Sequence, residues 1–236
     1  MAEEGGVAAV DRALSLLACF RGDDYSLTLT EMAKRTGLYK STALRLSESL
    51  VKANYLYRLS DGSYQIGVAA FQLGAIYQRQ FKTSEYVPPV LRDIVAELNE
   101  SASYYVYVDG QRLCLHRVEA DNQIIRDAVR EGDVRPLEGG ATGTIMMAFR
   151  GDAGKEMDAV RKQNWAASFG GAHEEMAAVA VPVFAVQQAL AGSVSVSGPR
   201  YRFEQKGAES MVPALTRAAI RLTNLLGGDA SVFAKP

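Results

Sequence analysis

Two short helical patterns separated by one glycine constrain the fold of this chain more than any other feature. Thr28 and Glu31 are three residues apart, so each side chain can accept a hydrogen bond from the backbone amide of the other at a helix start. We expect that helix to end at Gly37, because glycine readily adopts the left-handed conformation of a helix C-terminus. A second helix begins at Lys40, and two helices joined by so short a turn are typical of a helix-turn-helix.

An amphipathic pattern precedes this pair of helices, and a hairpin pattern follows it. Apolar residues recur at three- and four-residue spacing over residues 10–20, which predicts a helix with one apolar face. Over residues 55–67, two alternating runs flank Asp61 and Gly62, a dipeptide that favours a tight hairpin turn. A helix-turn-helix followed by a hairpin is a winged helix. The residues expected on the apolar face of the helix at 10–20 are Val10, Ala13, Leu14, Leu17 and Ala18.

The polar face of the helix that begins at Lys40 carries side chains that suit DNA recognition. Residues 34–60 hold six Lys and Arg against one Glu, a local charge of +5, although the whole chain has a net charge of -1. Arg45 can donate two hydrogen bonds to a guanine, and nearby hydroxyls can bond phosphates or bases. For any one of these residues the alternative is a solvated helix face. The predicted DNA-binding residues are Tyr39, Lys40, Ser41, Thr42, Arg45 and Arg58.

Several segments resemble a known family. VDRALSLLACF, LTLTEMAKRTGLYKSTALRLSESLVKANYLYR and GSYQIG resemble the winged-helix domain of the isocitrate lyase regulator (IclR) family of bacterial transcription factors. RPLEGGATGTIMMAF resembles the loop and helix beside that family's effector pocket, and VAVPVF with AGSVSVSGP resembles its paired terminal strands. The resemblance covers most of residues 7–227. It implies a DNA-binding repressor or dual regulator that is controlled by a small metabolite.

The pattern after the hairpin predicts a linker helix and a second domain. Residues 68–81 are mostly apolar at helical spacing, with Ala70, Phe71, Leu73, Gly74 and Tyr77, which suits a helix with one packed face. Asp109 and Gly110 then form the expected turn of another hairpin. Helices and strands together predict an α+β fold with a mainly antiparallel sheet, which the resemblance makes GAF-like. The expected domains are a winged helix-turn-helix at 7–67, a linker helix at 68–82 and an effector-binding domain at 83–228. In that last domain we expect helices at 87–99, 141–149, 155–163 and 204–226, and strands at 104–108, 112–118, 124–129, 179–184 and 189–197.

Small residues and serines point to a ligand site in the second domain. Gly139, Gly140 and Ala141 stand just before a helix with open backbone amides, which suit an anion or a carbonyl. Ser195 and Ser197 alternate with valines, so both hydroxyls lie on one face of a strand. The resemblance carries the family's ligand contacts over to Gly140, Ala141, Ser168, Ala178, Ser195 and Ser197. Departures from the family pattern fall at Tyr39, where Pro is usual, and at Glu138, Gly140, Thr144, Ser168 and Ala178.

The departures suggest the chemistry of the effector. Small side chains at Gly140 and Ala178, without an obvious cation or acid pair, predict a roomy and weakly polar pocket for an aromatic or other organic acid. Tyr105, Tyr107 and Trp165 lie in neighbouring parts of the pattern and support this hypothesis. The alternative is that these aromatic residues only fill the core.

Other kinds of site are not indicated. His116 and His173 lack a second His or Cys at zinc-ligand spacing, and we predict neither a metal site nor a cofactor. No nucleotide-binding or hydrolase motif occurs, so no enzyme is expected. Cys114 and His116 alternate on one expected strand and would share a face as two core residues.

The cysteines and the apolar runs indicate the cellular compartment in which the protein is expected. The two cysteines lie in apolar runs, so no disulfide framework is indicated and a reducing cytoplasm is expected. The acidic N-terminus is unlike a secretory signal. The apolar stretch 176–196 is interrupted by Pro182, Gln187, Gln188 and Gly192, which indicates a pair of strands and not a membrane span.

The expected partners are double-stranded operator DNA, a small-molecule effector and a second copy of the chain. One recognition helix buries little surface, so we expect a homodimer, which can pair further into a tetramer. A different class of function remains open at this point: a metabolite sensor or small-molecule enzyme whose winged helix serves protein-protein assembly. A steep salt dependence of DNA binding would separate the two, because neutralised phosphates release counterions.

Overall fold

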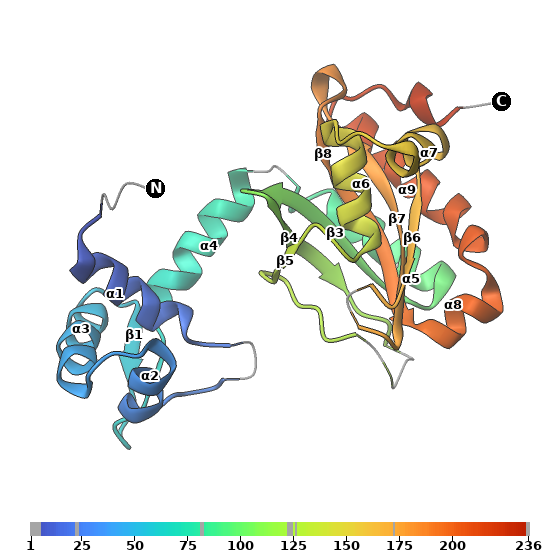
Figure 1. Ribbon diagram of the computed structural model, residues 1–236. Helices are drawn as coiled ribbons and strands as arrows, with labels where there is room; N and C mark the ends of the chain where they lie inside the picture. The colour runs from blue at the N-terminus through green and yellow to red at the C-terminus, as the bar shows by residue number, and fades with distance from the viewer. Residues whose placement is uncertain are drawn as a thin grey trace. The chain divides into compact units, whose positions relative to one another are not determined.

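The computed structural model describes residues 6–21, 24–80, 83–121, 125, 127–171 and 173–234. The chain divides into two compact units, Met1–Phe81 and Lys82–Pro236, which are described separately (Figure 1). Within the described ranges, no helix is long and apolar enough to cross a bilayer.

The first unit is a winged helix. A cluster of buried apolar side chains from its helices and its hairpin forms the core, with Leu16, Met32, Ala43 and Tyr64 at its centre. Figure 1 shows its elements in blue to cyan. They are α1 (Ala8–Ala18), α2 (Leu29–Thr36), α3 (Lys40–Lys52), β1 (Leu56–Arg58), β2 (Tyr64–Ile66) and α4 (Val68–Gln80). Residues 81 and 82 of the expected linker helix lie outside the described residues.

The start and end of α2 follow from its sequence as predicted. The amide of Glu31 donates to the Thr28 hydroxyl at 3.3 Å, and the amide of Thr28 donates to the Glu31 carboxylate at 2.8 Å. Both halves of the capping box are therefore formed. Gly37 ends the helix with a φ of 71°, and α3 begins three residues later.

The wing is also formed as predicted, with one addition. β1 and β2 pair antiparallel, with Leu56 opposite Ile66, and Asp61 accepts hydrogen bonds from Ser63 inside the turn. Leu27, just before α2, exchanges backbone hydrogen bonds with Tyr64 of β2. This bridge ties the start of the helix-turn-helix to the wing.

The prediction for the apolar face of α1 was wrong in part. Leu16, which was not assigned to that face, is fully buried, whereas Val10 and Leu14 are more than half exposed. A spacing of three and four residues fits two neighbouring helix faces, and packing on α2 and α3 selected the face around Leu16. The predicted packed face of α4 differs as well, because Phe71 and Leu73 are exposed.

The second unit is an α+β domain around one six-stranded sheet. The sheet has the order β5-β4-β3-β8-β7-β6, and all its neighbouring strands are antiparallel. Its strands are β3 (Ser101–Val108), β4 (Gln111–Val118), β5 (Val134–Pro136), β6 (Ala166–Phe169), β7 (Met176–Phe184) and β8 (Leu190–Pro199). Its helices are α5 (Val87–Leu98), α6 (Ala141–Arg150), α7 (Lys155–Gln163), α8 (Arg200–Lys206) and α9 (Val212–Leu225), with short 3-10 turns at Val186–Gln188, Ala208–Met211 and Ala230–Phe233.

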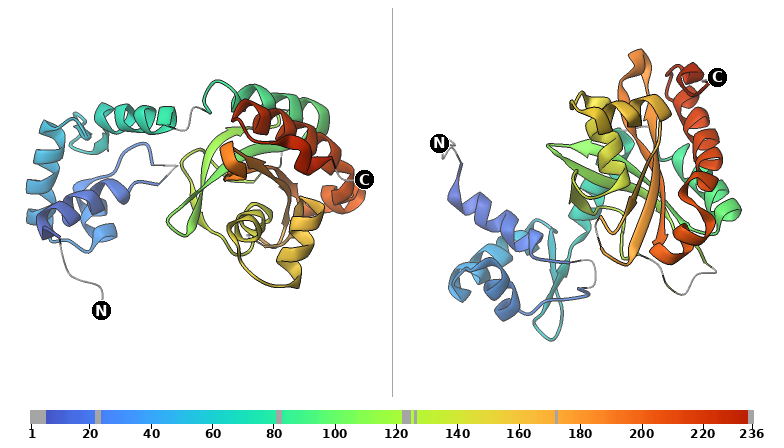
Figure 2. Two further views of the ribbon diagram at one scale, coloured as in Figure 1. Left: turned by 90° about the horizontal axis from the view of Figure 1, so that it is seen from above. Right: turned by 45° about the vertical axis from the view of Figure 1, so that its right-hand side comes forward.

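The two faces of this sheet carry different side chains. Helices α5 and α9 cover one face, and α6 lies against the other, with α7 packed on it (Figure 1, Figure 2). Val194 and Val196 of β8 are fully buried, whereas Ser195 and Ser197 pair with Ala180 and Ala178 of β7 on the α6 side. The alternation along β8 therefore directs the serines toward α6.

Two expected elements differ from the structure. The helix expected at 204–226 is interrupted at Gly207, whose φ of 77° ends α8, and α9 begins only at Val212. Residues 124 and 126 of the strand expected at 124–129 lie outside the described residues, and residues 127–129 are not in a strand. The edge strand next to β4 is β5, further along the chain.

Cys114 and His116 were expected to share one face of their strand, and that expectation was wrong because the register of β4 shifts between them. Cys114 lies opposite Tyr105 and His116 lies opposite Tyr104, so two residues of β4 separate positions that are adjacent on β3. Adjacent residues of a strand point to opposite faces. Cys114 accordingly packs near α6 with Met146, whereas His116 reaches Thr83 with a ring nitrogen to hydroxyl distance of 3.0 Å.

Candidate nucleic-acid interface and effector cavity

The exposed face of α3 carries the side chains predicted to bind DNA. Ala43 and Leu50 are buried in the core of the unit, while Tyr39, Lys40, Ser41 and Arg45 are exposed. Thr42 is partly exposed, and Arg58 is exposed at the end of β1. The predicted residues therefore lie on a polar face that begins at the N-cap of α3, except Arg58, which lies on the wing.

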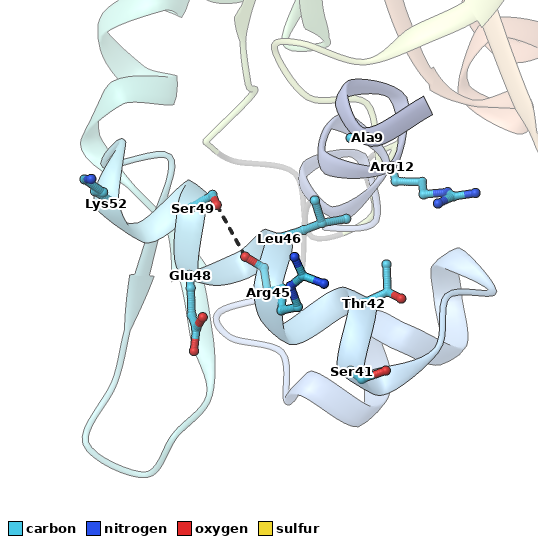
Figure 3. A pocket seen from close by; sticks show the side chains of 9 residues that line it. All are labelled: Ala9, Arg12, Ser41, Thr42, Arg45, Leu46, Glu48, Ser49 and Lys52. Carbon is cyan, nitrogen blue, oxygen red and sulfur yellow. Dashed lines mark hydrogen bonds between the residues drawn. The ribbon is translucent and has the colours of Figure 1, made fainter. Parts of the chain in front are cut away.

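A hollow of about 620 Å³ lies between this face and α1. Figure 3 shows the side chains that line it, with Arg12 on α1 and Thr42 and Arg45 on α3. Arg12 is a cation that the sequence analysis did not assign to the site, because the signal in residues 10–20 was apolar periodicity. Two guanidinium groups at one hollow suit the phosphates of a nucleic-acid backbone.

One of the six cations in residues 34–60 is paired with an acidic residue of the same unit. Arg35 forms an ion pair with Asp24 and donates a hydrogen bond to the carbonyl of Cys19 at 3.0 Å. The Arg35 guanidinium holds the pKa of the Asp24 carboxyl below its usual range, because it donates hydrogen bonds to the charged form. The local charge of +5 thus overstates the cations that α3 and its neighbours offer to a ligand.

A small cavity lies between the N-terminal end of α6 and the sheet of the second unit. Its volume is about 60 Å³, and all six residues predicted to contact a ligand line it. The backbone amide of Ala141 at the start of α6 donates to the Ser168 hydroxyl at 3.1 Å. Binding of a ligand by these residues stays a prediction; the structure brings them together. They are Gly140, Ala141, Ser168, Ala178, Ser195 and Ser197.

Charged groups line the same cavity, contrary to the expectation of a roomy and weakly polar pocket. Arg112, Asp127 and Arg135 all contribute to its wall. Arg112 is only 6% exposed, and its Nη1 donates to the Thr142 hydroxyl. The sequence did not single out these residues because they lie on β4, on β5 and in the segment before it, outside the glycine and serine motifs that predicted the site.

Asp127 is fixed by two neighbours. Its carboxylate accepts hydrogen bonds from the Ser197 hydroxyl and from the Arg117 guanidinium, which is itself buried. Arg117 also donates to the Ser103 hydroxyl at 2.9 Å. The negative charge of Asp127 is therefore balanced within the protein.

The aromatic residues divide between the cavity and the core. Tyr105 lines the cavity and is buried, with the Arg112 guanidinium 5.7 Å from the centre of its ring. Tyr107 instead packs under Arg150, whose Cζ lies 3.5 Å from the centre of the Tyr107 ring. Neither Tyr107 nor Trp165 is part of the cavity wall. The structure thus supports only one of the three aromatic residues as a neighbour of a ligand.

No catalytic or metal constellation appears in the part of the chain that the structure describes. Burial raises the pKa of the Cys114 thiol to about 12, so the thiol stays protonated near neutral pH and is a poor nucleophile. Among the described residues, no group of three or more His, Cys, Asp and Glu could hold a metal ion.

Comparison with known protein families matches both units. The IclR helix-turn-helix domain matches residues 9–60, and the C-terminal domain of the bacterial transcriptional regulator IclR matches residues 153–224. The HTH-type transcriptional regulator KipR of Bacillus subtilis is 22% identical over 231 residues, covering 86% of this chain and 90% of KipR. The transcriptional repressor IclR of Escherichia coli is 25% identical over 147 residues, covering 61% of this chain and 53% of that protein.

Solved structures share the fold. An IclR transcriptional regulator from Alicyclobacillus acidocaldarius has a TM-score of 0.78 and 23% identity, covering 94% of this chain and 100% of that one. An IclR homologue from Microbacterium hydrocarbonoxydans, solved with 4-hydroxybenzoate, has a TM-score of 0.75 and 19% identity, covering 93% of this chain and 99% of that one.

The winged helix, the α+β domain and these matches define a class: a two-domain, helix-turn-helix transcriptional regulator. Its matched domains bind DNA and regulate, and its relatives are named as regulators and not as enzymes. Within this class, the chain belongs to the IclR family.

Proposed function

We propose that this regulator binds operator DNA through α3 and that a small organic metabolite in the cavity of the second unit controls its affinity for DNA. The observation that carries the DNA half is the exposed polar face of α3, with Arg45 and Arg12 both lining the hollow beside it. A helix of this kind reads base edges in the major groove, while nearby cations contact phosphates.

The proposed contacts divide by chemistry. Arg45 contacts a base, Lys40, Ser41 and Thr42 contact phosphates or bases, and Arg58 contacts the backbone from the wing. Tyr39, which is 86% exposed, replaces the proline usual in the family and adds a ring that can pack on the DNA backbone. Arg12 of α1 joins them as a phosphate contact.

The effector half rests on the cavity at the start of α6. Six residues predicted from the resemblance line one cavity, and a homologue with the same fold was solved with 4-hydroxybenzoate. The cavity volume of about 60 Å³ favours a small ligand, or one whose binding widens the space between α6 and the sheet. A ligand that binds better to one of two conformations shifts the equilibrium between them, and the affinity for DNA changes with it.

We infer that the working form is a dimer, able to pair into a tetramer, and that it acts in the cytoplasm, where DNA is present. The support is a group of large apolar side chains that α1 and α4 leave exposed, because exposed apolar groups are typical of association sites. These side chains are Val10, Leu14, Phe71, Leu73 and Ile76.

Repression is the direction of control that we propose first. The support is the name of the Escherichia coli relative, a transcriptional repressor. A bound regulator represses when its operator overlaps the promoter, and the same DNA contacts can serve activation at another position.

Thermal unfolding in the presence of 2-oxo acids, aromatic acids, sugars and amino acids tests the effector half. A compound at 100 times its dissociation constant adds about 2.7 kcal/mol to the stability of the folded state. We expect at least one compound to raise Tm and to change the affinity for DNA fragments selected by the protein from genomic DNA. A compound that raises Tm without altering DNA affinity would contradict control through this cavity.

A further inference from the structure

A buried arginine without an acidic partner lies at the wall of the cavity. Arg112 is 6% exposed, and none of the ion pairs between described residues includes it. Its Nε has no hydrogen-bond partner, and its Nη1 donates to the neutral hydroxyl of Thr142. A guanidinium stays charged near neutral pH even when burial lowers its pKa, as it does for Arg112.

Such a charge is costly in the folded protein. Removal of an ion from water is strongly unfavourable unless a counter-ion and hydrogen bonds compensate. The ring of Tyr105, 5.7 Å from Cζ of Arg112, and the Thr142 hydroxyl compensate only in part. The other cation of the wall, Arg135, adds a positive charge and has Asp133 at 3.8 Å.

The remaining groups around the cavity do not supply the missing negative charge. Asp127 is the acidic residue of the wall, and its carboxylate is already held by Arg117 and Ser197. The N-terminal end of α6 points backbone amides at the same space, which adds positive potential. The cavity is therefore electropositive around Arg112.

Gly140 makes room for this guanidinium. A Cβ at position 140 would lie 2.5 Å from Nη2 and 2.8 Å from Cζ of Arg112, closer than non-bonded atoms approach. The φ of Gly140 is -159°, an extended conformation that any residue adopts, so its backbone does not require glycine. The absent side chain leaves space for the charged group of Arg112 against the start of α6.

We propose that Arg112 is the counter-ion of the effector, so that the cavity selects small organic acids over neutral molecules of the same shape. The carboxylate of the ligand binds the free side of the guanidinium, near the backbone amides at the start of α6. This inference rests on the proposed function, because it assumes that the cavity holds the effector.

Matched pairs of acid and amide test the selection. We would titrate the full-length protein by calorimetry with pyruvate, succinate, benzoate and 4-hydroxybenzoate, and with the corresponding carboxamides. We expect at least one acid to bind, and its amide to bind at least tenfold more weakly, because the amide carries no charge for Arg112 to neutralise.

Variants assign the selection to this residue. Arg112→Met keeps the length of the side chain without its charge, and Arg112→Lys keeps the charge without the planar fork. Arg150→Met is the matched control, because Arg150 also lies over a tyrosine, Tyr107, but outside the cavity. We expect Arg112→Met to lose at least tenfold in affinity for the acid, Arg112→Lys to retain part of it, and Arg150→Met to bind as the wild type does.

Stability without ligand separates this role from a structural one. If Arg112 serves as the counter-ion of the ligand, Arg112→Met removes an unpaired buried charge, and Tm without ligand stays the same or rises. If Arg112 instead holds β4 against α6, the Tm of Arg112→Met falls. The folded variant then binds the acid as tightly as the wild type does. Gly140→Ala is an independent variant, because its added Cβ displaces the guanidinium, and it is expected to weaken acid binding at least tenfold.

The outcomes are distinguishable. Equal binding of an acid and its amide, or unchanged acid binding by Arg112→Met, overturns the role of Arg112 and leaves the cavity as an effector site. If neither acids nor neutral compounds bind the wild-type protein, the proposed effector function fails as a whole. A tenfold preference for the acid that disappears in Arg112→Met supports the proposal.

Discussion

At the scale of single residues, the two sites differ in how far local sequence could reveal them. Arg45 stands on a helix whose exposed face follows from its spacing, so the local pattern is sufficient. Arg112 lies in the alternating run Gln111–Val118, where alternation indicates a face but not burial. Its surroundings come from Thr142 and Gly140, about thirty residues away in sequence, and only the folded chain brings these together.

Substitutions at the hollow between α1 and α3 distinguish base contacts from phosphate contacts. Arg45→Ala is expected to weaken binding to the selected operator by about 1 to 3 kcal/mol and to change random DNA much less, because a base contact carries specificity. Arg12→Ala is expected to weaken both equally and to reduce the salt slope by about one. Fluorescence anisotropy with both duplexes measures these effects. Equal losses for Arg45→Ala on both duplexes would show that Arg45 meets only phosphate.

His116 predicts a dependence of stability on pH. Burial lowers the pKa of His116 from its ordinary value of 6.5, although Glu131 at 4.0 Å opposes the shift. The unfolded chain then binds a proton more readily than the folded one, so stability is fully present above about pH 6.5 and is lost as pH falls through the folded-state pKa. Urea unfolding from pH 8 to 5 should show this loss of unfolding free energy for the wild type and less of it for His116→Gln. An equal loss in both proteins would contradict the assignment to His116.

At the scale of elements, local chemistry predicted most helices and turns. The capping box, Gly37 and the Asp61 turn decide their structures within a few residues, and all three are formed. The errors have longer-range causes. Val10 and Leu14 are apolar without facing the core, and the register shift in β4 depends on its pairing with β3. Gly207 carries a turn signal inside a helical pattern, and a single glycine does not by itself decide whether a helix continues.

Gly37 and Gly74 provide a matched pair of substitutions with opposite signs. Gly37 has a φ of 71°, so Gly37→Ala forces a left-handed alanine and is expected to destabilise the first unit by about 1 kcal/mol. Gly74 lies inside α4, and Gly74→Ala should stabilise that helix by about 0.5 to 1 kcal/mol. Neither added Cβ meets another atom within 4 Å, so the signs report backbone conformation alone. Chemical denaturation of the two variants would contradict this account if both moved stability in the same direction.

At the scale of the whole molecule, the apolar side chains left exposed on α1 and α4 predict self-association. Leu14→Asp and Phe71→Asp each place a charge on this surface, and we expect both variants to be monomers or to dissociate at concentrations where the wild type is a dimer. Tyr201→Asp, at an exposed position of α8, is the control and should leave the mass unchanged. Light scattering after size exclusion measures the mass, and a monomeric wild type would contradict the proposed dimer.

The central claim is that the face of α3 binds DNA through its charges and hydroxyls and not as a protein-assembly surface. The most direct test measures the affinity of the wild-type protein for its selected operator duplex over a range of salt concentrations. We predict a linear fall of log K with log salt, with a slope set by the number of phosphates contacted, and tighter binding to the operator than to random DNA at every salt concentration. Binding that ignores salt, or that does not distinguish the operator from random DNA, would contradict the account.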